Sequence, residues 1–257
     1  MLPPIKGFIK NTLIDWEGRI ASEIFLPGCN FRCPYCHSPH LVVSANTLEE
    51  IPFYAVREYL KENRSWVDSV VISGGEPTIH AELESLASEF KSLDVAVKID
   101  TNGSNPQLLA SLVDRRLVDS ISMDLKAPLN DKYSSAAGVP VDLSLIGESI
   151  ALLLSNKVDC EFRTTVCSLF TDEEDIIKIA KTISGAKKYV LQEFRGGNCL
   201  DPALNTYRSF TRDELKELAK RASVYVENCF VRGEPQPQQS KPDITPTVPD
   251  SEREKKR

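Results

Sequence analysis

The chain has 257 residues, of which 41% are hydrophobic and 26% charged, and its formal net charge is −6. This length and apolar content fit one large domain with a real core, a size at which α/β barrels occur as single units. The negative charge argues against nucleic-acid binding, no apolar run reaches the roughly 18 residues of a membrane span, and the N-terminus lacks a signal-peptide pattern. We therefore expect a cytoplasmic protein that binds neither nucleic acid nor a membrane.

Short runs rich in β-forming residues alternate with amphipathic helical patterns. The predicted strands cover residues 19–26, 67–72, 95–99, 118–123, 159–166 and 188–194. The predicted helices include 47–62, 81–91 and 144–154, with capping boxes at 47–50, 171–174 and 211–214 and an Asn-Pro helix start at 105–106. Six alternations predict a parallel sheet with right-handed crossovers, and so an α/β fold.

Beyond Arg232 the composition shifts to Pro, Gln, Ser and charged residues. Such a segment cannot bury enough apolar surface to order itself. We expect residues 1–232 to form one domain and residues 233–257 to form a disordered tail.

Cys29, Cys33 and Cys36 stand at the spacing C-x3-C-x2-C directly after the first predicted strand. Three thiolates on one loop can hold three irons of a [4Fe–4S] cluster and leave the fourth iron open. The alternative is a structural zinc site completed by His37 or His40, but such sites usually join two separated ligand pairs, and no second C-x2-C pair follows. The remaining cysteines are scattered and are expected as buried core thiols: Cys160, Cys167, Cys199 and Cys229.

Polar side chains follow each of the six predicted strands, and in parallel α/β folds ligand groups collect at these strand ends. The groups are the cysteine loop, Gly74-Gly75-Glu76-Pro77, Asp100-Thr101-Asn102-Gly103, Asp124-Leu125-Lys126, Glu161 with Arg163, and Gln192-Glu193-Phe194-Arg195. Each group alone has an ordinary explanation as a turn, a helix cap or a solvated charge. Six of them at one barrel mouth indicate a shared site.

The cysteine spacing resembles the signature of radical S-adenosylmethionine (radical SAM) enzymes, and residues 18–196 resemble their glycyl-radical-enzyme activases. The run Cys-Pro-Tyr-Cys-His-Ser-Pro at 33–39 is similar to the activase cluster loop, and 74–77 matches the motif that binds the SAM amino group. The resemblance implies a partial (βα)6 TIM-like barrel of the radical SAM type, with a [4Fe–4S] cluster on the loop after the first strand. It also implies SAM at the open iron, cleaved reductively to methionine and a 5′-deoxyadenosyl radical.

SAM carries an amino group, a carboxylate, a ribose and an adenine, each of which needs a complementary group. Backbone carbonyls at the two glycines can accept hydrogen bonds from the amino group, and a lysine or arginine can pair with the carboxylate. Asp124, Asn102 or Gln192 could bind the ribose hydroxyls, and the ring of Tyr35 suits the adenine. The candidate cofactor-binding residues are Tyr35, His37, Gly74, Gly75, Glu76, Pro77, Asp100, Thr101, Asn102, Asp124, Lys126, Arg163 and Gln192.

The resemblance to pyruvate formate-lyase activating enzyme implies that Asp124 reaches the ribose and Lys126 the carboxylate. It also implies that Asp100 and Asp124 can hold a monovalent cation. That enzyme has a histidine after its sixth strand that touches the ribose, and here Gln192 is the candidate replacement. No eight-cysteine ferredoxin insertion follows the cluster loop, which argues against activases of the glycerol or benzylsuccinate type.

Residues 161–166 and 192–194 most resemble the activating proteins of anaerobic ribonucleoside-triphosphate reductase. The resemblance implies a radical SAM oxidoreductase that forms a glycyl radical on this reductase, with a flavodoxin- or ferredoxin-type electron donor. One alternative is an activase of another partner, such as pyruvate formate-lyase. Another is a small-molecule enzyme such as 7-carboxy-7-deazaguanine synthase, although that family typically has Asp at the position of His37. A zinc-stabilised adaptor without catalysis is the third.

Overall fold

The computed structural model describes residues 2–233, in which eight strands form one sheet whose order follows the chain. β1 (Gly7–Thr12) pairs antiparallel with β2 (Ala21–Leu26), and each later strand pairs in parallel with the one before it. The later strands are β3 (Ser69–Gly74), β4 (Ala96–Thr101), β5 (Ser120–Asp124), β6 (Asp159–Val166), β7 (Tyr189–Glu193) and β8 (Cys229–Val231). No pairing joins β1 to β8 within the described residues, so the curved sheet is a partial barrel.

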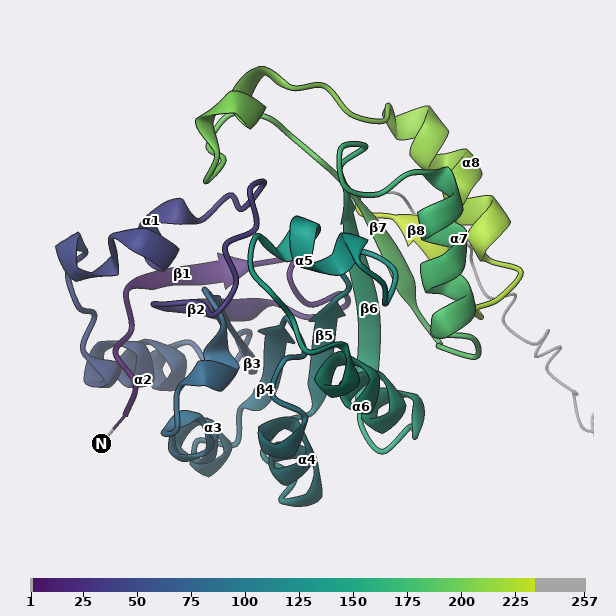
Figure 1. Ribbon diagram of the computed structural model, residues 1–257. Coiled ribbons are helices and arrows are strands. Elements are labelled where there is room, and N and C mark those ends of the chain that lie inside the picture. Colours follow the sequence, from purple (N-terminus) through teal and green to yellow (C-terminus); the bar gives the residue numbers. More distant parts are fainter. Residues whose placement is uncertain (1, 234–257) are drawn as a thin grey trace, which may run out of the picture.

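Helices cover the outer face of the sheet, as Figure 1 shows. The α-helices are α1 (Pro39–Val43), α2 (Phe53–Glu62), α3 (Leu83–Ser92), α4 (Pro106–Asp114), α5 (Lys132–Ala137), α6 (Leu143–Leu154), α7 (Glu173–Thr182) and α8 (Arg212–Ala222). Short 3₁₀ turns are η1 (Ala45–Thr47), η2 (Pro77–Ile79) and η3 (Pro202–Thr206). None of the helices in residues 2–233 is long and apolar enough to cross a membrane.

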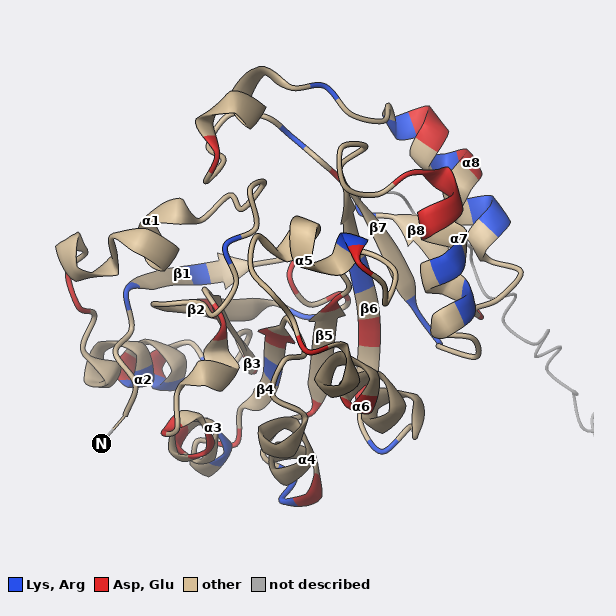
Figure 2. Ribbon diagram, viewed as in Figure 1, with Lys and Arg blue, Asp and Glu red and all other residues tan. Residues whose placement is uncertain are grey.

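The sheet has an apolar outer face and a polar inner face because residues alternate along each strand. Ile99 of β4, Ile121 of β5 and Phe162 of β6 are fully buried in the core between the sheet and the helices. Their strand neighbours Lys98 and Glu161 are also buried, but they belong to a network of charges on the opposite face. Figure 2 marks acidic and basic positions along β4, β5 and β6 in red and blue. The polar lining of the barrel therefore comes from the same strands as the apolar core.

The six predicted strands correspond to β2 to β7, so the predicted α/β fold with a parallel partial barrel is confirmed. The prediction missed β1, which has three exposed residues among its six and no clean apolar alternation, and β8, which has only three residues. The cysteine loop therefore follows the second strand in chain order rather than the first. That strand is still the first parallel one, so the loop lies at the predicted end of the sheet.

Two predicted helix starts are confirmed. Asn105 caps α4 by accepting a hydrogen bond from the backbone N–H of Leu108 at 3.2 Å. Thr211 and Glu214 form a reciprocal capping box at the start of α8.

Two other predicted starts need correction. No helix begins at Thr47, because α2 starts only at Phe53 after an extended Pro52, and proline disfavours helical backbone at the residue before it. The predicted box at 171–174 is displaced by one residue, since Asp172 is the cap and Asp175 its partner. At 171–175 both Thr171 with Glu174 and Asp172 with Asp175 have the spacing of a capping box, and the local sequence does not choose between the two pairs.

The four scattered cysteines are buried, as expected of core thiols: Cys160, Cys167, Cys199 and Cys229. The predicted tail at 233–257 lies, apart from Gly233, outside the described residues. The boundary at residue 232 therefore stays a prediction.

Candidate functional site

A single pocket at the carboxyl ends of β2 to β6 gathers residues that are far apart in the sequence. Every predicted site residue except Pro77 and Gln192 lines it: Cys29, Cys33, Tyr35, Cys36, His37, Gly74, Gly75, Glu76, Asp100, Thr101, Asn102, Asp124, Lys126 and Arg163. Phe31, Val42, Ser73 and Thr165 complete the lining. The structure thus brings together, at one end of the sheet, the groups that the strand ends predicted.

Backbone hydrogen bonds hold the cysteine loop against neighbouring segments of the chain. Gly28, in the left-handed region at φ +80°, donates from its N–H to the carbonyl of Leu41 at 2.8 Å. Cys33 is buried, and Cys29 and Cys36 are half-buried. Burial raises the pKa of the Cys29 thiol to about 11 and also raises the pKa of Cys33, while the Lys126 charge acts against both shifts. Since ligation requires thiolates, metal binding here must release protons.

Gly74 and Gly75 permit two loops to touch. Gly74 has φ +120°, and a Cβ there would lie 2.3 Å from the carbonyl oxygen of Leu26. A Cβ on Gly75 would lie 1.7 Å from the carbonyl oxygen of Gly28. The glycines are therefore required first by packing of the β3 end against the cysteine loop. This packing is what places their backbone at the pocket wall.

Glu76 ties the end of β3 to the end of β4. Its buried carboxylate accepts hydrogen bonds from the backbone N–H and hydroxyl of Thr78, the hydroxyl of Thr101 and the backbone N–H of Asn102, at 2.6–3.0 Å. Burial raises the pKa of this carboxyl, and the four donors act to lower it. The predicted site residue Glu76 thus holds other pocket residues in place, while Pro77 begins η2 outside the pocket lining.

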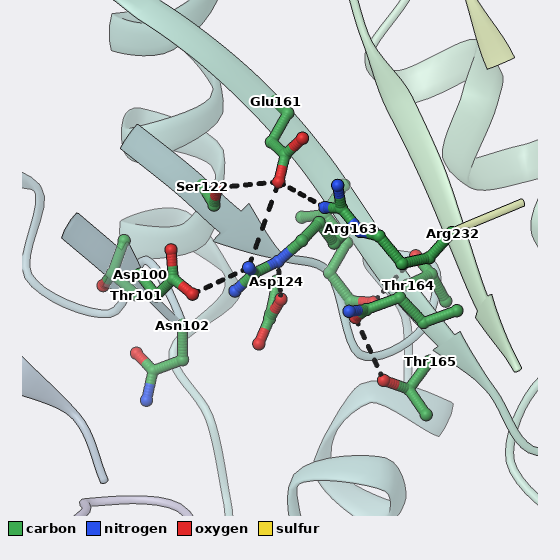
Figure 3. A network of polar contacts seen from close by, with 12 residues as sticks. Asp100, Thr101, Asn102, Ser122, Asp124, Glu161, Arg163, Thr164, Thr165 and Arg232 are labelled. Atoms are coloured by element: carbon green, nitrogen blue, oxygen red, sulfur yellow. Dashed lines mark hydrogen bonds and ion pairs between the residues drawn. The ribbon is translucent and has the colours of Figure 1, made fainter. Parts of the chain in front are cut away.

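Arg163 joins two carboxylates at the pocket floor (Figure 3). Its Nε donates to Asp124 Oδ1 and its Nη1 to Asp100 Oδ2, each at 2.8 Å. Lys126 donates to the other oxygen of Asp124 at 3.1 Å. Burial acts to raise the pKa of Asp124, but the charges of Arg163 and Lys126 lower it to about 2. Burial likewise acts to lower the pKa of Lys126, but Asp124 raises it well above its usual value.

This arrangement separates the roles of the two cations that line the pocket. Arg163 spends its Nε and Nη1 on protein carboxylates, whereas Lys126 makes one contact and is half-buried. The Arg163 guanidinium also lies between Asp100 and Asp124, where the sequence analysis expected a monovalent cation. The chain therefore supplies a positive charge there itself, and the added cation stays a prediction.

A second set of charges lies beneath these residues. Glu161 accepts from Ser122 at 2.9 Å and from Arg232 at 2.6 Å, and Lys98 lies 3.6 Å away. Burial acts to raise the pKa of Glu161, but Lys98, Arg163 and Arg232 lower it to about 2. The sequence analysis missed Lys98, although a lysine two residues before Asp100 in an apolar strand was an available signal. Arg232 follows a three-residue strand and carried no such signal.

The segment after β7 packs along the cysteine loop. The backbone N–H groups of Leu200 and Asp201 donate to the carbonyls of Cys36 at 3.0 Å and Pro34 at 2.8 Å. Nε2 of the His37 ring lies 2.5 Å from the carbonyl oxygen of Arg195. His37 thus reaches out of the cysteine loop to the segment after β7. Figure 1 shows this segment crossing above the sheet before α8.

Gln192 and Tyr35 occupy different surroundings. Gln192 lies in a neighbouring groove and accepts from the hydroxyl of Thr165, a pocket residue, at 3.4 Å. The structure therefore does not bring Gln192 into the pocket lining. Tyr35 does line the pocket, and its ring packs against Phe170 with centroids 5.4 Å apart.

Comparisons with known proteins agree with this geometry. Residues 24–183 match the radical SAM superfamily. Over 236 residues the chain is 33% identical to a Methanocaldococcus jannaschii protein provisionally named a glycyl-radical enzyme activating enzyme, covering 89% of this chain and 95% of that protein. A 7-carboxy-7-deazaguanine synthase of Hyperthermus butylicus is 39% identical, but over only 35% of this chain and 38% of its own length. The crystal structure of Streptococcus suis SuiB matches 77% of this chain and 44% of its own, with a TM-score of 0.61 and 16% identity.

The chain therefore belongs to the radical SAM superfamily and is an enzyme of that class. Membership implies a [4Fe–4S] cluster and SAM as cofactors. The relative that matches almost the whole chain carries the name of a glycyl-radical enzyme activating enzyme.

The donor set fits a [4Fe–4S] cluster, because three thiols of one loop can each bind one iron. In residues 2–233 no group of three His, Cys, Asp or Glu side chains is arranged to share one metal ion. Thiolates that each bind a different iron need not converge in that way. All three thiols nevertheless line one pocket, beside Lys126, whose charge offsets that of thiolates.

Proposed function

We propose that this chain is a radical SAM activase that forms a glycyl radical on a partner enzyme. One observation carries the proposal: three thiols, two close-packed glycines and the pair Asp124–Lys126 share a pocket, in a chain whose relative of matching length is named as such an activase. Cys29, Cys33 and Cys36 would hold the cluster. When bound, the cluster and SAM supply one-electron chemistry that yields a hydrogen-abstracting radical.

The residues of the chain bind and orient SAM in this proposal. Lys126 pairs with the carboxylate, since Arg163 is occupied by Asp100 and Asp124. Asp124 and Asn102 face the ribose, carbonyls at Gly74 and Gly75 accept from the amino group, and the Tyr35 ring contacts the adenine. Asp124 is ionised at neutral pH, because Arg163 and Lys126 hold its pKa at about 2 despite burial.

We propose anaerobic ribonucleotide reductase as the partner. The support is the sequence of β6 and of the end of β7, which resembles that of this reductase's activating proteins. A flavodoxin- or ferredoxin-type protein would supply the electron. The deazaguanine synthase alternative is weaker, since the likeness to that enzyme covers about a third of the chain and His37 replaces its usual Asp.

Isotope transfer tests the proposal. The reduced protein, SAM and an anaerobic ribonucleotide reductase with deuterated glycines should give a glycyl-radical doublet in electron paramagnetic resonance and deuterium in 5′-deoxyadenosine. A reductase whose radical-site glycine is replaced by alanine is the control and should give neither signal. If 6-carboxy-tetrahydropterin is added to the assay and consumed while the 5′-deoxyadenosine stays unlabelled, the chain is instead a deazaguanine synthase.

A further inference from the structure

The turn Cys29-Asn30-Phe31 at the start of the cysteine loop carries a hydrogen-bond donor to one of the loop's own sulfurs. The backbone N–H of Phe31 donates to Cys29 Sγ, with 3.3 Å between the nitrogen and the sulfur. A neutral thiol is a weak acceptor, whereas a metal-bound thiolate carries negative charge and accepts more strongly. The turn therefore has a donor in place for the form of Cys29 that binds metal.

The side chain of Arg32 closes this turn. Its Nη1 donates to the carbonyl of Cys29 at 2.5 Å and to the carbonyl of Phe31 at 2.8 Å. Phe31 is thus held at both of its backbone polar groups, the N–H by the sulfur and the carbonyl by the guanidinium. Arg32 therefore fixes the residue whose N–H meets the sulfur.

Helix α5 fixes the backbone of Arg32 itself. The backbone N–H of Arg32 donates to the carbonyl of Ala137, the last residue of α5, at 2.8 Å. Gly138 follows at φ +69°, and a Cβ there would lie 2.0 Å from the carbonyl oxygen of Arg32. Both backbone polar groups of Arg32 therefore lie against the end of α5, and the side chain acts on the turn from a fixed base.

Arg32 also brings a positive charge to the cysteine loop. The residue is exposed, and among residues 2–233 its guanidinium donates to these two carbonyls and to no carboxylate. Arginine stays protonated in proteins. One-electron reduction makes a thiolate-bound cluster more negative, so a nearby cation and N–H donors to ligand sulfur both favour the reduced state.

We propose that Arg32 is a positioning residue that raises the reduction potential of the cluster held by the cysteine loop. It acts through Phe31, whose N–H it keeps on the Cys29 sulfur, and its own charge adds to the effect. The electron still comes from the flavodoxin- or ferredoxin-type donor, which loses one electron as the cluster gains it. The inference rests on the proposed cluster site and is independent of which partner the enzyme activates.

The test measures the reduction potential of the anaerobically loaded protein without SAM. Arg32→Met removes the charge and both hydrogen bonds, and we expect it to bind four irons and to disfavour the reduced cluster by about fivefold. At 59 mV per tenfold for a one-electron couple, this is about 41 mV. Arg32→Lys keeps the charge and a donor and should recover most of the loss. Arg64→Met is the control, because Arg64 lies near residues 19–20 and 68, before β2 and β3, at the end of the sheet opposite the pocket.

Amide exchange in the iron-free protein, followed by nuclear magnetic resonance, supplies a second readout. The N–H of Phe31 should exchange faster in R32M than in the wild type, because the turn is no longer closed, and R64M should leave its rate unchanged. A four-iron R32M with the wild-type potential overturns the inference, and so does an unchanged exchange rate of Phe31. An R32M chain that cannot take up four irons also counts against it, since Arg32 then serves cluster assembly. A wild-type chain that holds no [4Fe–4S] cluster refutes the proposed function itself, and the inference with it.

Discussion

The guanidinium of Arg163 donates from Nε to Oδ1 of Asp124 at 2.8 Å, so a residue of β6 fixes the carboxylate at the end of β5. The two residues are also direct register partners in the sheet. Strand pairing therefore places the ion pair, and the ion pair in turn orients the acid that faces the pocket.

Replacing Arg163 by methionine should destabilise the protein strongly. The change leaves the carboxylates of Asp124 and Asp100 buried without their main cation, and breaking a buried pair costs about 3–5 kcal/mol. Lys61→Met is the control, since its pair with Glu58 is about half exposed on both sides and should cost about 0–1 kcal/mol. Urea unfolding of both variants measures the difference, and equal losses would contradict a buried role for Arg163.

Glu76→Gln should lower both stability and SAM affinity. In the wild type one carboxylate oxygen accepts three hydrogen bonds and the other accepts the N–H of Asn102. An amide has one oxygen, so its NH2 group must face a donor, at a cost of about 1–3 kcal/mol. The matched change Glu217→Gln, at an exposed position of α8, should alter neither quantity. A Glu76→Gln variant as stable as the wild type would show that the carboxyl is protonated and donates.

Glu23 on β2 should make stability fall as pH rises. Burial, with the nearby charges of Asp15 and Asp100, raises its pKa to about 8. Because the folded state binds this proton more tightly than the unfolded state, its contribution is complete below the unfolded pKa near 4.5 and is lost as pH rises toward 8. Glu23→Gln mimics the protonated carboxyl and should flatten this dependence, adding on the order of a few kcal/mol at pH 8 relative to the wild type. Chemical denaturation at pH 5 and pH 8 checks it, and parallel curves for the two proteins would exclude the role of Glu23.

The sequence predicts the pocket well because each parallel strand ends at the same edge of the sheet. Asp100, Asp124 and the cysteines could be assigned to one site once their strands were recognised. The sequence could not show how charges pair inside the barrel: whether Arg163 meets a ligand or two carboxylates depends on the register of β4, β5 and β6. It also did not reveal α5, whose six residues are too few to give a helical periodicity.

The three loop cysteines should each be indispensable for cluster assembly. Cys29→Ala, Cys33→Ala or Cys36→Ala should abolish visible absorption of the cluster and SAM cleavage together, because only these thiols line the pocket. Cys160→Ala is the control, since that thiol is buried in the core away from the pocket lining and should leave four irons per chain. Iron and sulfide assays decide the matter. Four irons in a triple loop variant would reject the assignment.

Lys126 should matter for SAM binding more than for cluster assembly. It makes a single ion pair, with Asp124, whereas Arg163 is held by two carboxylates, and losing a partly buried charge pair costs about 2–5 kcal/mol. Lys126→Met should therefore weaken SAM binding by tens-fold or more while the loaded protein keeps its four irons. Lys157→Met, which removes an exposed lysine paired with Asp114 at 3.5 Å, serves as the matched control and should bind SAM as the wild type does. Equilibrium dialysis of the loaded proteins against labelled SAM measures both. Equal affinity in wild type and Lys126→Met would transfer the carboxylate contact to Arg163, which would then have to release Asp100 or Asp124 on binding.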